Sequence, residues 1–171
     1  KNYGVAGQVD ITHLVNKAQV DCLNQHGEHN VQQLFSDQGH LESEVDPQLM
    51  IAVPFQQSVK LHSLKLIPVK DKLDQAPKTI KLYANQQSLG FDEANDVGAT
   101  QQIELTEADF AEDVTVPLRF VKFQSVNNLV LFIESNQADD EDTPTLLSRL
   151  IFIGAPVDTT RMENFNANKE K

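Results

Sequence analysis

The sequence contains a single cysteine, Cys22, and no tryptophan. One thiol cannot form an internal disulfide, complete a dithiol redox cycle or supply a four-cysteine zinc site. Cys22 follows Asp21 in an apolar-periodic segment and has no base beside it in the sequence. We therefore expect a buried structural thiol, since free cysteine is among the most buried residue types. The lone cysteine also favours a reducing compartment.

Long apolar runs and clusters of basic residues are missing as well. No stretch approaches the ~20 apolar residues that a membrane-spanning helix needs. The 25 acidic residues outnumber the 14 lysines and arginines, which gives a formal net charge of -11, and the six lysines between residues 60 and 81 are interleaved with apolar residues. Such a charge repels nucleic acid and anionic membranes. We expect a soluble monomer that binds neither.

Catalytic and metal-binding motifs are also absent from the sequence. There is no glycine-rich phosphate loop and no serine nucleophile elbow. Acidic runs such as residues 139–142 are typical of solvated surface, whereas general acid–base catalysis needs a carboxylate desolvated beside a cleft. His26, Glu28 and His29 are the natural place to look for a metal, but zinc needs three or four ligands held by second-shell partners. We expect no enzyme activity, cofactor or metal site.

The chain instead carries several short apolar runs with turn signals between them. They predict strands over residues 49–53, 59–66, 80–84, 102–105, 118–123, 129–134 and 146–153. Pro54 should end the first strand because it cannot donate to a ladder, and a phase change between His62 and Ser63 predicts a bulge there. Since strands and helices do not alternate, we predict an all-β sandwich or jelly roll, with mixed α+β as the alternative.

The segments between these strands are longer and more polar. Residues 9–23 have nearly helical spacing with Asp10 as a cap, which predicts a short helix or two turns. Residues 25–44 should form a long loop around the sheet, and residues 88–98 a further loop. Thr106 and Asp109 resemble a capping box and predict a single helical turn.

The strand pattern also selects the side chains of the core. Apolar side chains on the inner faces of the strands should pack between two sheet layers. The predicted core consists of Ile51, Val53, Leu61, Leu64, Leu66, Ile80, Leu82, Phe120, Val121, Phe123, Leu129, Leu131, Ile133, Leu150 and Phe152. Because most phenylalanines lie in apolar runs, core packing explains them better than a sugar-binding platform does.

Several of these segments resemble one known family. Residues 117–137, with the runs Pro117-Leu118-Arg119-Phe120-Val121-Lys122-Phe123 and Glu134-Ser135-Asn136-Gln137, are similar to the PITH domain, the proteasome-interacting thioredoxin domain. Further matching pieces follow in family order at residues 22–24, 41–43, 46–55, 59–61, 91–94, 104–107 and 152–157. The pieces cover most of residues 17–165, while the loop over residues 25–40 departs from the family pattern.

The resemblance implies a β-sandwich jelly roll, galactose-binding-like or Doc-like, with a short N-terminal helix and long loops. We expect an N-terminal linker over residues 1–16, the PITH domain over residues 17–157 and a C-terminal tail over residues 158–171. The resemblance further implies a non-catalytic module that docks a thioredoxin-like redox protein on the regulatory particle of the 26S proteasome, in the cytoplasm and nucleus. Redox chemistry would belong to an upstream thioredoxin domain. The alternative is a small-ligand or carbohydrate-binding jelly roll.

The segment over residues 159–165 is the candidate partner-binding site. Arg161, Met162 and Phe165 follow the last predicted strand, and these residue types are favoured at interface cores. The alternative is that Phe165 folds back and caps the sandwich. The first residues have neither an initiator methionine nor a signal-peptide pattern, which agrees with a domain preceding this one.

Overall fold

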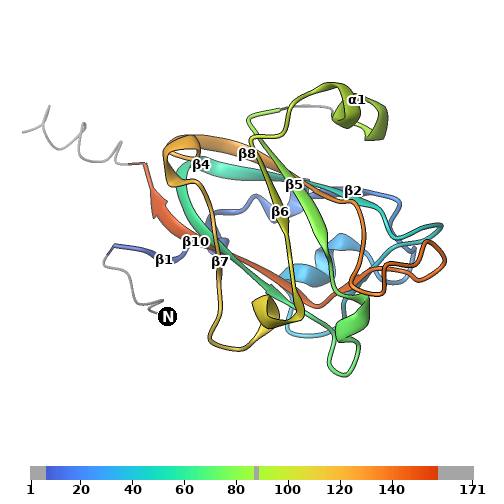
Figure 1. Ribbon diagram of the computed structural model, residues 1–171. Coiled ribbons are helices and arrows are strands. Elements are labelled where there is room, and N and C mark those ends of the chain that lie inside the picture. Colours follow the sequence, from blue (N-terminus) through green and yellow to red (C-terminus); the bar gives the residue numbers. More distant parts are fainter. Residues whose placement is uncertain (1–6, 87–88, 158–171) are drawn as a thin grey trace, which may run out of the picture.

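The structure is a computed structural model that describes residues 7–86 and 89–157 (Figure 1). Antiparallel strands dominate it. One sheet has the order β1-β10-β4-β8-β5-β6, with β2 and β7 also paired to β4, and β3 pairs with β9 in a small second sheet. The strands are β1 (Val9–Asp10), β2 (Asp21–Leu23), β3 (Leu41–Glu42), β4 (Leu49–Ile67), β5 (Thr79–Ala84), β6 (Gln101–Glu104), β7 (Val116–Pro117), β8 (Val126–Ile133), β9 (Leu146–Leu147) and β10 (Arg149–Pro156). The predicted all-β class is confirmed.

The long strand β4 connects two layers of a sandwich. Its first part, up to Pro54, pairs with β2 and β8, and its second part pairs with β10 and β7. The register to β8 shifts between Pro54 and Val59, and the sheet curls over at this point (Figure 1). Strands β8, β5 and β6 complete the first layer, and β10 and β1 complete the second.

Pro54 does not end the first strand, which corrects the expectation from the sequence. Strand β4 continues to Ile67. Pro54 lies at the bend, where the ladder to β8 is interrupted, and its carbonyl oxygen accepts a hydrogen bond from the Asn16 N–H at 2.8 Å. A residue without an N–H group is tolerated at such an irregularity.

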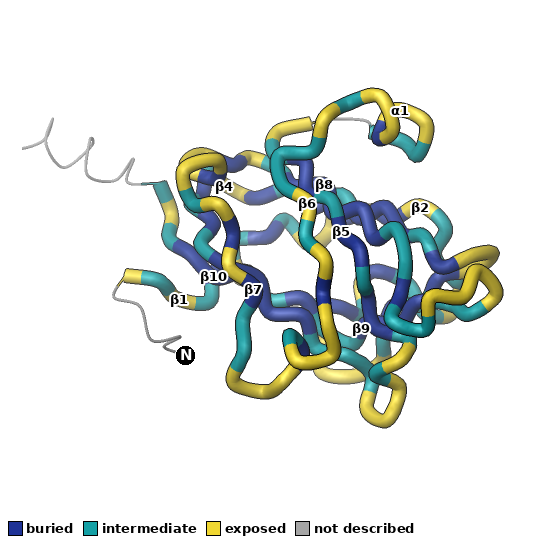
Figure 2. Tube along the Cα trace, in the orientation of Figure 1, coloured by how far each residue is buried: buried dark blue, intermediate teal, exposed yellow. Residues whose placement is uncertain are grey.

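The core lies between the two layers and appears as buried segments in Figure 2. Of the fifteen predicted core residues, all but Phe120 and Val121 are buried. Phe120 is half-buried and Val121 is 83% exposed, so these two predictions are wrong. Both residues belong to the 3-10 helix η6 (Phe120–Lys122), which ends at the buried Phe123. The strand predicted over residues 118–123 therefore does not form.

The bulge expected between His62 and Ser63 is confirmed. Leu61 and Ser63 of β4 pair with consecutive residues of β10, so His62 is the extra residue. As a consequence, Leu61 and Leu64 both point into the core although they are an odd number of residues apart. Gly154 lies opposite the bulge, and a Cβ atom there would overlap a backbone carbonyl oxygen of β4. This close approach requires glycine.

The N-terminal segment forms two 3-10 turns, η1 (Thr12–Leu14) and η2 (Lys17–Gln19), where a short helix or two turns was expected. The N-cap of the first turn is Ile11 rather than the expected Asp10, although the Asp10 carboxylate accepts a hydrogen bond from the Thr12 N–H at 2.9 Å. Ile11 and Val15, which precede and follow the first turn, are buried in the core. The turns therefore anchor this segment to the sandwich.

Of the two expected domain boundaries, the structure gives information on the N-terminal one. Strand β1 pairs with β10, so the boundary expected between residues 16 and 17 falls inside a packed segment. The tail expected over residues 158–171 lies outside the described residues.

The remaining helices are short. They are η3 (Val31–Phe35), η4 (Leu73–Gln75), α1 (Phe91–Asp96) and η5 (Glu107–Phe110). Helix α1 lies in residues 88–98, which were predicted to be a loop, although acidic side chains in its first turn are typical of a helix start. The capping box of Thr106 and Asp109 is confirmed at the start of η5. None of the described helices has the length and apolar character needed to cross a membrane.

Candidate functional site

The outer face of the first layer carries a second apolar cluster, separate from the core. Cross-strand pairing aligns its side chains in rows over β2, β4, β8 and β5. One row contains Leu23, Met50, Phe132 and Lys81, and the next contains Asp21, Ala52, Val130 and Tyr83. Most apolar members of these rows are buried although they point away from the core. Another element therefore covers part of this face.

Helix α1 and the residues around it cover the β5 side of the outer face. The Tyr83 hydroxyl donates a hydrogen bond to the Ala94 carbonyl oxygen at 3.0 Å. The Phe91 ring meets the Phe132 ring edge to face, with centroids 5.7 Å apart. Burial raises the pKa of the Tyr83 phenol, so its hydroxyl remains a donor at neutral pH. One hydrogen bond and a small apolar cluster hold α1 on the sheet.

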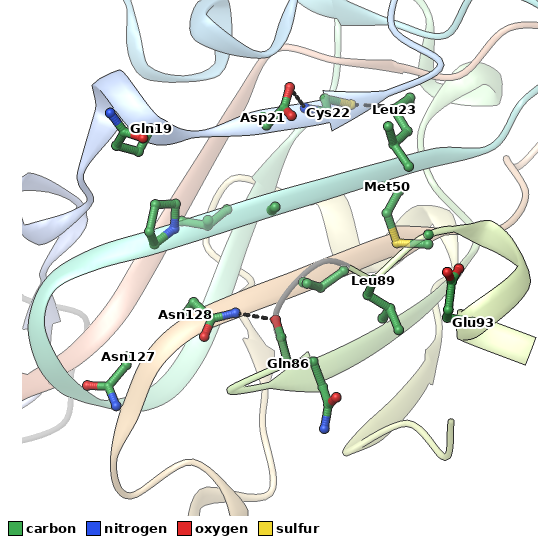
Figure 3. A pocket seen from close by; sticks show the side chains of 15 residues that line it. Gln19, Asp21, Cys22, Leu23, Met50, Gln86, Leu89, Glu93, Asn127 and Asn128 are labelled. Atoms are coloured by element: carbon green, nitrogen blue, oxygen red, sulfur yellow. Dashed lines mark hydrogen bonds between the residues drawn. The ribbon is translucent and has the colours of Figure 1, made fainter. Parts of the chain in front are cut away.

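The rest of the outer face forms an open groove of about 590 Å³ (Figure 3). Met50, Ala52 and Val130 lie on its sheet side, between strand β2 and the segment that leads into α1. Figure 3 shows Asn127 and Asn128 toward one end and Glu93 toward the other. This volume is within the range of ligand pockets, and we take the groove as the candidate functional site.

The chemistry of the groove suits binding rather than catalysis. Among the described residues, its charged lining residues are Asp21 and Glu93, and no lysine, arginine, histidine or aromatic residue of that part of the chain lines it. Such a surface can accept an apolar side chain with a cation beside it. The expected burial of Cys22, which also borders the groove, is confirmed because this residue is 7% exposed.

The Cys22 thiol is not a nucleophile at neutral pH. Burial, with a smaller contribution from the Asp21 carboxylate, raises its pKa to about 12. The reactive form of cysteine is the thiolate, and electropositive surroundings are needed to produce it. A carboxylate neighbour has the opposite effect.

The histidine that could share a metal ion with His29 is not the one nearest to it in the sequence. His26 Nδ1 accepts a hydrogen bond from the Glu28 N–H at 3.1 Å. Among the described residues, the group with donor atoms close enough to share a metal ion is His29, His40 and Glu42. Sequence reasoning missed the last two because they are distant from His29 in the chain. The available signal was their spacing of two residues, which places both side chains on one face of a strand.

The acidic run over residues 139–142 forms a turn on the surface. The Asp140 carboxylate accepts hydrogen bonds from the Asp142 N–H at 3.0 Å and from the Thr143 hydroxyl at 2.9 Å. These two hydrogen bonds lower the pKa of Asp140. The carboxylate therefore stabilises a turn, as expected for a solvated loop. The candidate partner-binding residues Arg161, Met162 and Phe165 lie outside the described residues.

Comparison with solved structures identifies the fold. The family 32 carbohydrate-binding module of Clostridium perfringens NanJ, solved with galactose, has a TM-score of 0.61 at 6% identity, covering 85% of this chain and 98% of that chain. The CBM32-1 and CBM32-2 domains of Clostridium perfringens ZmpB have a TM-score of 0.62 at 12% identity, covering 92% of this chain and 39% of that chain. Identities this low show the fold alone. The predicted galactose-binding-like jelly roll is confirmed.

Comparison with protein families and curated proteins identifies relatives along the chain. It is 44% identical over 158 residues to thioredoxin-like protein 1 of Schizosaccharomyces pombe, covering 90% of this chain and 53% of the relative. It is 28% identical over 124 residues to PITH domain-containing protein 1 of Dictyostelium discoideum, covering 68% of this chain and 60% of the relative. The chain thus spans less than two thirds of each relative. Since the family model of the PITH domain matches residues 1–171, the chain belongs to the PITH domain family.

Proposed function

We propose that the chain is a non-catalytic interaction module that docks a thioredoxin-like redox protein on the regulatory particle of the 26S proteasome, in the cytoplasm and nucleus. The observation that carries this proposal is the 44% identity to thioredoxin-like protein 1, of which the chain spans 53%. The rest of that relative's length leaves room for a separate domain. An upstream thioredoxin domain in the same protein would then supply the disulfide reductase activity.

The groove on the outer sheet face supports a docking role. Its sheet side is apolar, Asp21 and Glu93 line it, and none of its lining residues in residues 7–86 and 89–157 is basic. The chain has a formal net charge of -11, which favours the approach of a basic surface. The occupant we propose is a segment of a proteasome subunit that places one apolar side chain on Ala52 and a lysine or arginine beside Glu93.

A carbohydrate is the alternative occupant, and the groove does not favour it. The carbohydrate-binding neighbours share the fold at 6% and 12% identity. Sugar sites commonly place an aromatic side chain under the ligand, but no aromatic residue of the described part of the chain lines this groove, and Tyr83 is buried beneath α1. Protein binding therefore agrees better with the residues present.

Capture of purified 26S proteasomes on the immobilised chain tests the proposal. Wild-type protein should retain proteasomes, and Glu93→Lys should lose most of this binding because the groove then repels a basic partner. Glu112→Lys is the matched control, since Glu112 is also exposed and lies outside the groove. Elution by free galactose instead of by salt would support the carbohydrate alternative. Failure of the wild-type chain to retain proteasomes would overturn the docking proposal.

The C-terminal segment is a second proposed contact with the same partner. A chain that ends at Pro156 lacks Arg161, Met162 and Phe165 and keeps the whole of β10. Loss of proteasome capture with an unchanged melting temperature would assign these side chains to the interface. A lower melting temperature would instead show that the segment caps the sandwich. If capture and stability both survive the deletion, the contact proposed for these residues is wrong.

A further inference from the structure

We propose that His29, His40 and Glu42 form a binding site for a divalent transition-metal ion of the zinc class. One ligand atom from each side chain lies within 4.8 Å of the other two. Two imidazole nitrogens and one carboxylate oxygen are a donor set used by Zn²⁺, which completes an open site with water. The site shares no residue with the groove and goes beyond the docking function.

The spacing of two ligand atoms already matches a tetrahedral ion. At zinc–ligand distances of about 2.0–2.1 Å, neighbouring ligand atoms in a tetrahedron are about 3.3 Å apart. His40 Nε2 and Glu42 Oε1 are 3.2 Å apart and form a hydrogen bond, so an ion bound between them would take the place of the shared proton. The His29 ring stacks on the His40 ring, with centroids 4.3 Å apart and planes inclined by 12°. A modest rotation of the His29 side chain would bring its nitrogen to the same ion.

Backbone hydrogen bonds hold the three residues in this arrangement. The Glu42 N–H donates to the His29 carbonyl oxygen at 3.0 Å, and the Glu42 carbonyl oxygen accepts from the His26 N–H at 2.8 Å. The His40 N–H donates to Gln33 Oε1 at 3.1 Å. His40 directly precedes strand β3 and Glu42 lies in it, and their spacing of two residues places both side chains on one face. The ligands are therefore largely positioned before an ion arrives.

The His29 ring provides an independent observation that points to a ligand. Within the described part of the chain, its Nδ1 atom is buried and has no hydrogen-bond partner. A buried nitrogen without a partner is destabilising, and coordination at this atom would satisfy it. The side chains of His40 and Glu42 are 24% and 25% exposed, so an ion and a water ligand can reach them.

His26 is close to this group and yet unsuited to join it. Its ring centroid lies 5.1 Å from that of His29. Because its Nδ1 already accepts a hydrogen bond from the Glu28 N–H, the proton of the neutral ring is on Nε2. The Nδ1 lone pair of His26 is thus already used by a backbone N–H, whereas Nδ1 of His29 has no partner among the described residues. His26 is therefore a matched control, with the same side chain in the same loop.

An ion at this site would cross-link the two ends of the segment that contains η3. His29 precedes this 3-10 helix, and His40 and Glu42 follow it. Helix η3 packs against β10 and β3 and contributes Val31 and Leu34 to the core. The metal would thus tie the segment between β2 and β3 to the sandwich and stabilise it.

Titration of the metal-free full chain with Co²⁺ and then Zn²⁺ tests this proposal. We expect saturation near one equivalent of Co²⁺, visible d–d absorption typical of a low-coordinate site, and loss of that absorption when Zn²⁺ is added. His40→Ala and Glu42→Gln should each weaken binding by more than the roughly 10–100-fold that loss of an outer-shell partner causes. His26→Ala should keep the wild-type affinity. Zn²⁺ should raise the melting temperature of the wild-type chain and leave that of His40→Ala unchanged.

Three results would overturn the proposal. They are the absence of saturable binding, an equal loss of affinity in His26→Ala, and persistence of wild-type binding in a His29→Ala, His40→Ala double variant. Circular dichroism checks that each variant is folded. Glu42→Gln keeps the size of the side chain and both backbone hydrogen bonds of residue 42, so it decides the outcome if an alanine variant fails to fold.

Discussion

The two faces of the first sheet layer consist of alternate residues of the same strands but are covered very differently. On the inner face, Ile51 and Leu131 are 0% exposed and pack against the second layer. On the outer face, Met50 and Val130 are also buried, whereas Ala52, which lies next to Met50 along β4 and opposite Val130, is half-buried in the groove. A full layer of strands covers the inner face, and one short helix covers part of the outer face. The inner face therefore determines stability, and the outer face leaves room for a ligand.

Truncation of an inner side chain should have the largest effect. Phe123 is fully buried in the core, and Phe123→Ala should lower the free energy of unfolding by about 3–5 kcal/mol through lost transfer energy and a cavity. Val121, two residues away, is 83% exposed, so Val121→Ala should change it by less than about 0.5 kcal/mol. Urea unfolding measures both. Similar losses of unfolding free energy in the two variants would contradict the burial of Phe123 and the exposure of Val121.

The buried Cys22 thiol should lower the free energy of unfolding at alkaline pH. Its folded-state pKa is raised from 9.0 to about 12 by burial. The unfolded chain loses this proton first as the pH rises, so the contribution is fully present below pH ~9 and is lost progressively toward pH ~12. At about 1.36 kcal/mol per pH unit, the expected loss is about 2 kcal/mol by pH ~10.5.

Urea unfolding of wild type and Cys22→Ala at neutral and alkaline pH measures this loss. The wild-type chain should lose about 2 kcal/mol more than the variant between these conditions. Burial also raises the pKa of Tyr83, and a hydrogen bond to Glu134 raises the pKa of Lys81. Because both residues are present in the wild type and in the variant, their contributions cancel in the comparison. Parallel pH curves for the two proteins would show that the thiol is not desolvated in the folded state.

The cover of the outer face should be weaker than the contact between the layers. Tyr83→Phe removes the hydrogen bond to the Ala94 carbonyl oxygen and should lower the free energy of unfolding by about 0.5–1.5 kcal/mol. Hydrogen exchange should quicken at the Val97 N–H, which bonds to Glu93 at the end of α1, and stay slow at Leu131 in β8. Equal protection of Val97 in both proteins would mean that this hydrogen bond does not hold α1.

Features set by local spacing were predictable from the sequence. The phase change around His62 requires a bulge because Leu61 and Leu64 cannot share one face of a regular strand, and the structure has that bulge. The turn after Thr106 follows from its own capping residues. In both cases the determining interactions lie within a few residues of each other.

Features set by distant contacts were not predictable. The apolar run over residues 118–123 is compatible with a buried strand or with a turn. The structure has the turn, in which the Leu61 N–H donates a hydrogen bond to the Phe123 carbonyl oxygen at 2.9 Å. Tyr83 alternates with core residues along β5, and nothing in its local sequence indicates that α1 covers it. The groove likewise depends on residues from β2, β4, β8 and the segment before α1. Only the tertiary fold brings these segments together.

The smallest effect on stability is expected for a larger side chain on the open part of the outer face. Ala52→Leu extends into the groove, where about 590 Å³ is available, and should change the free energy of unfolding by less than about 0.5 kcal/mol. The same substitution should reduce proteasome capture, since it fills the space proposed for the partner's apolar side chain. Val59→Leu is the matched core variant in the same strand, because Val59 is 0% exposed, lies outside the groove, and an added methylene there should cost about 1–3 kcal/mol by overpacking. Equal destabilisation in the two variants would show that the groove is closed in solution, whereas unchanged capture by a stable Ala52→Leu chain would move the docking surface elsewhere.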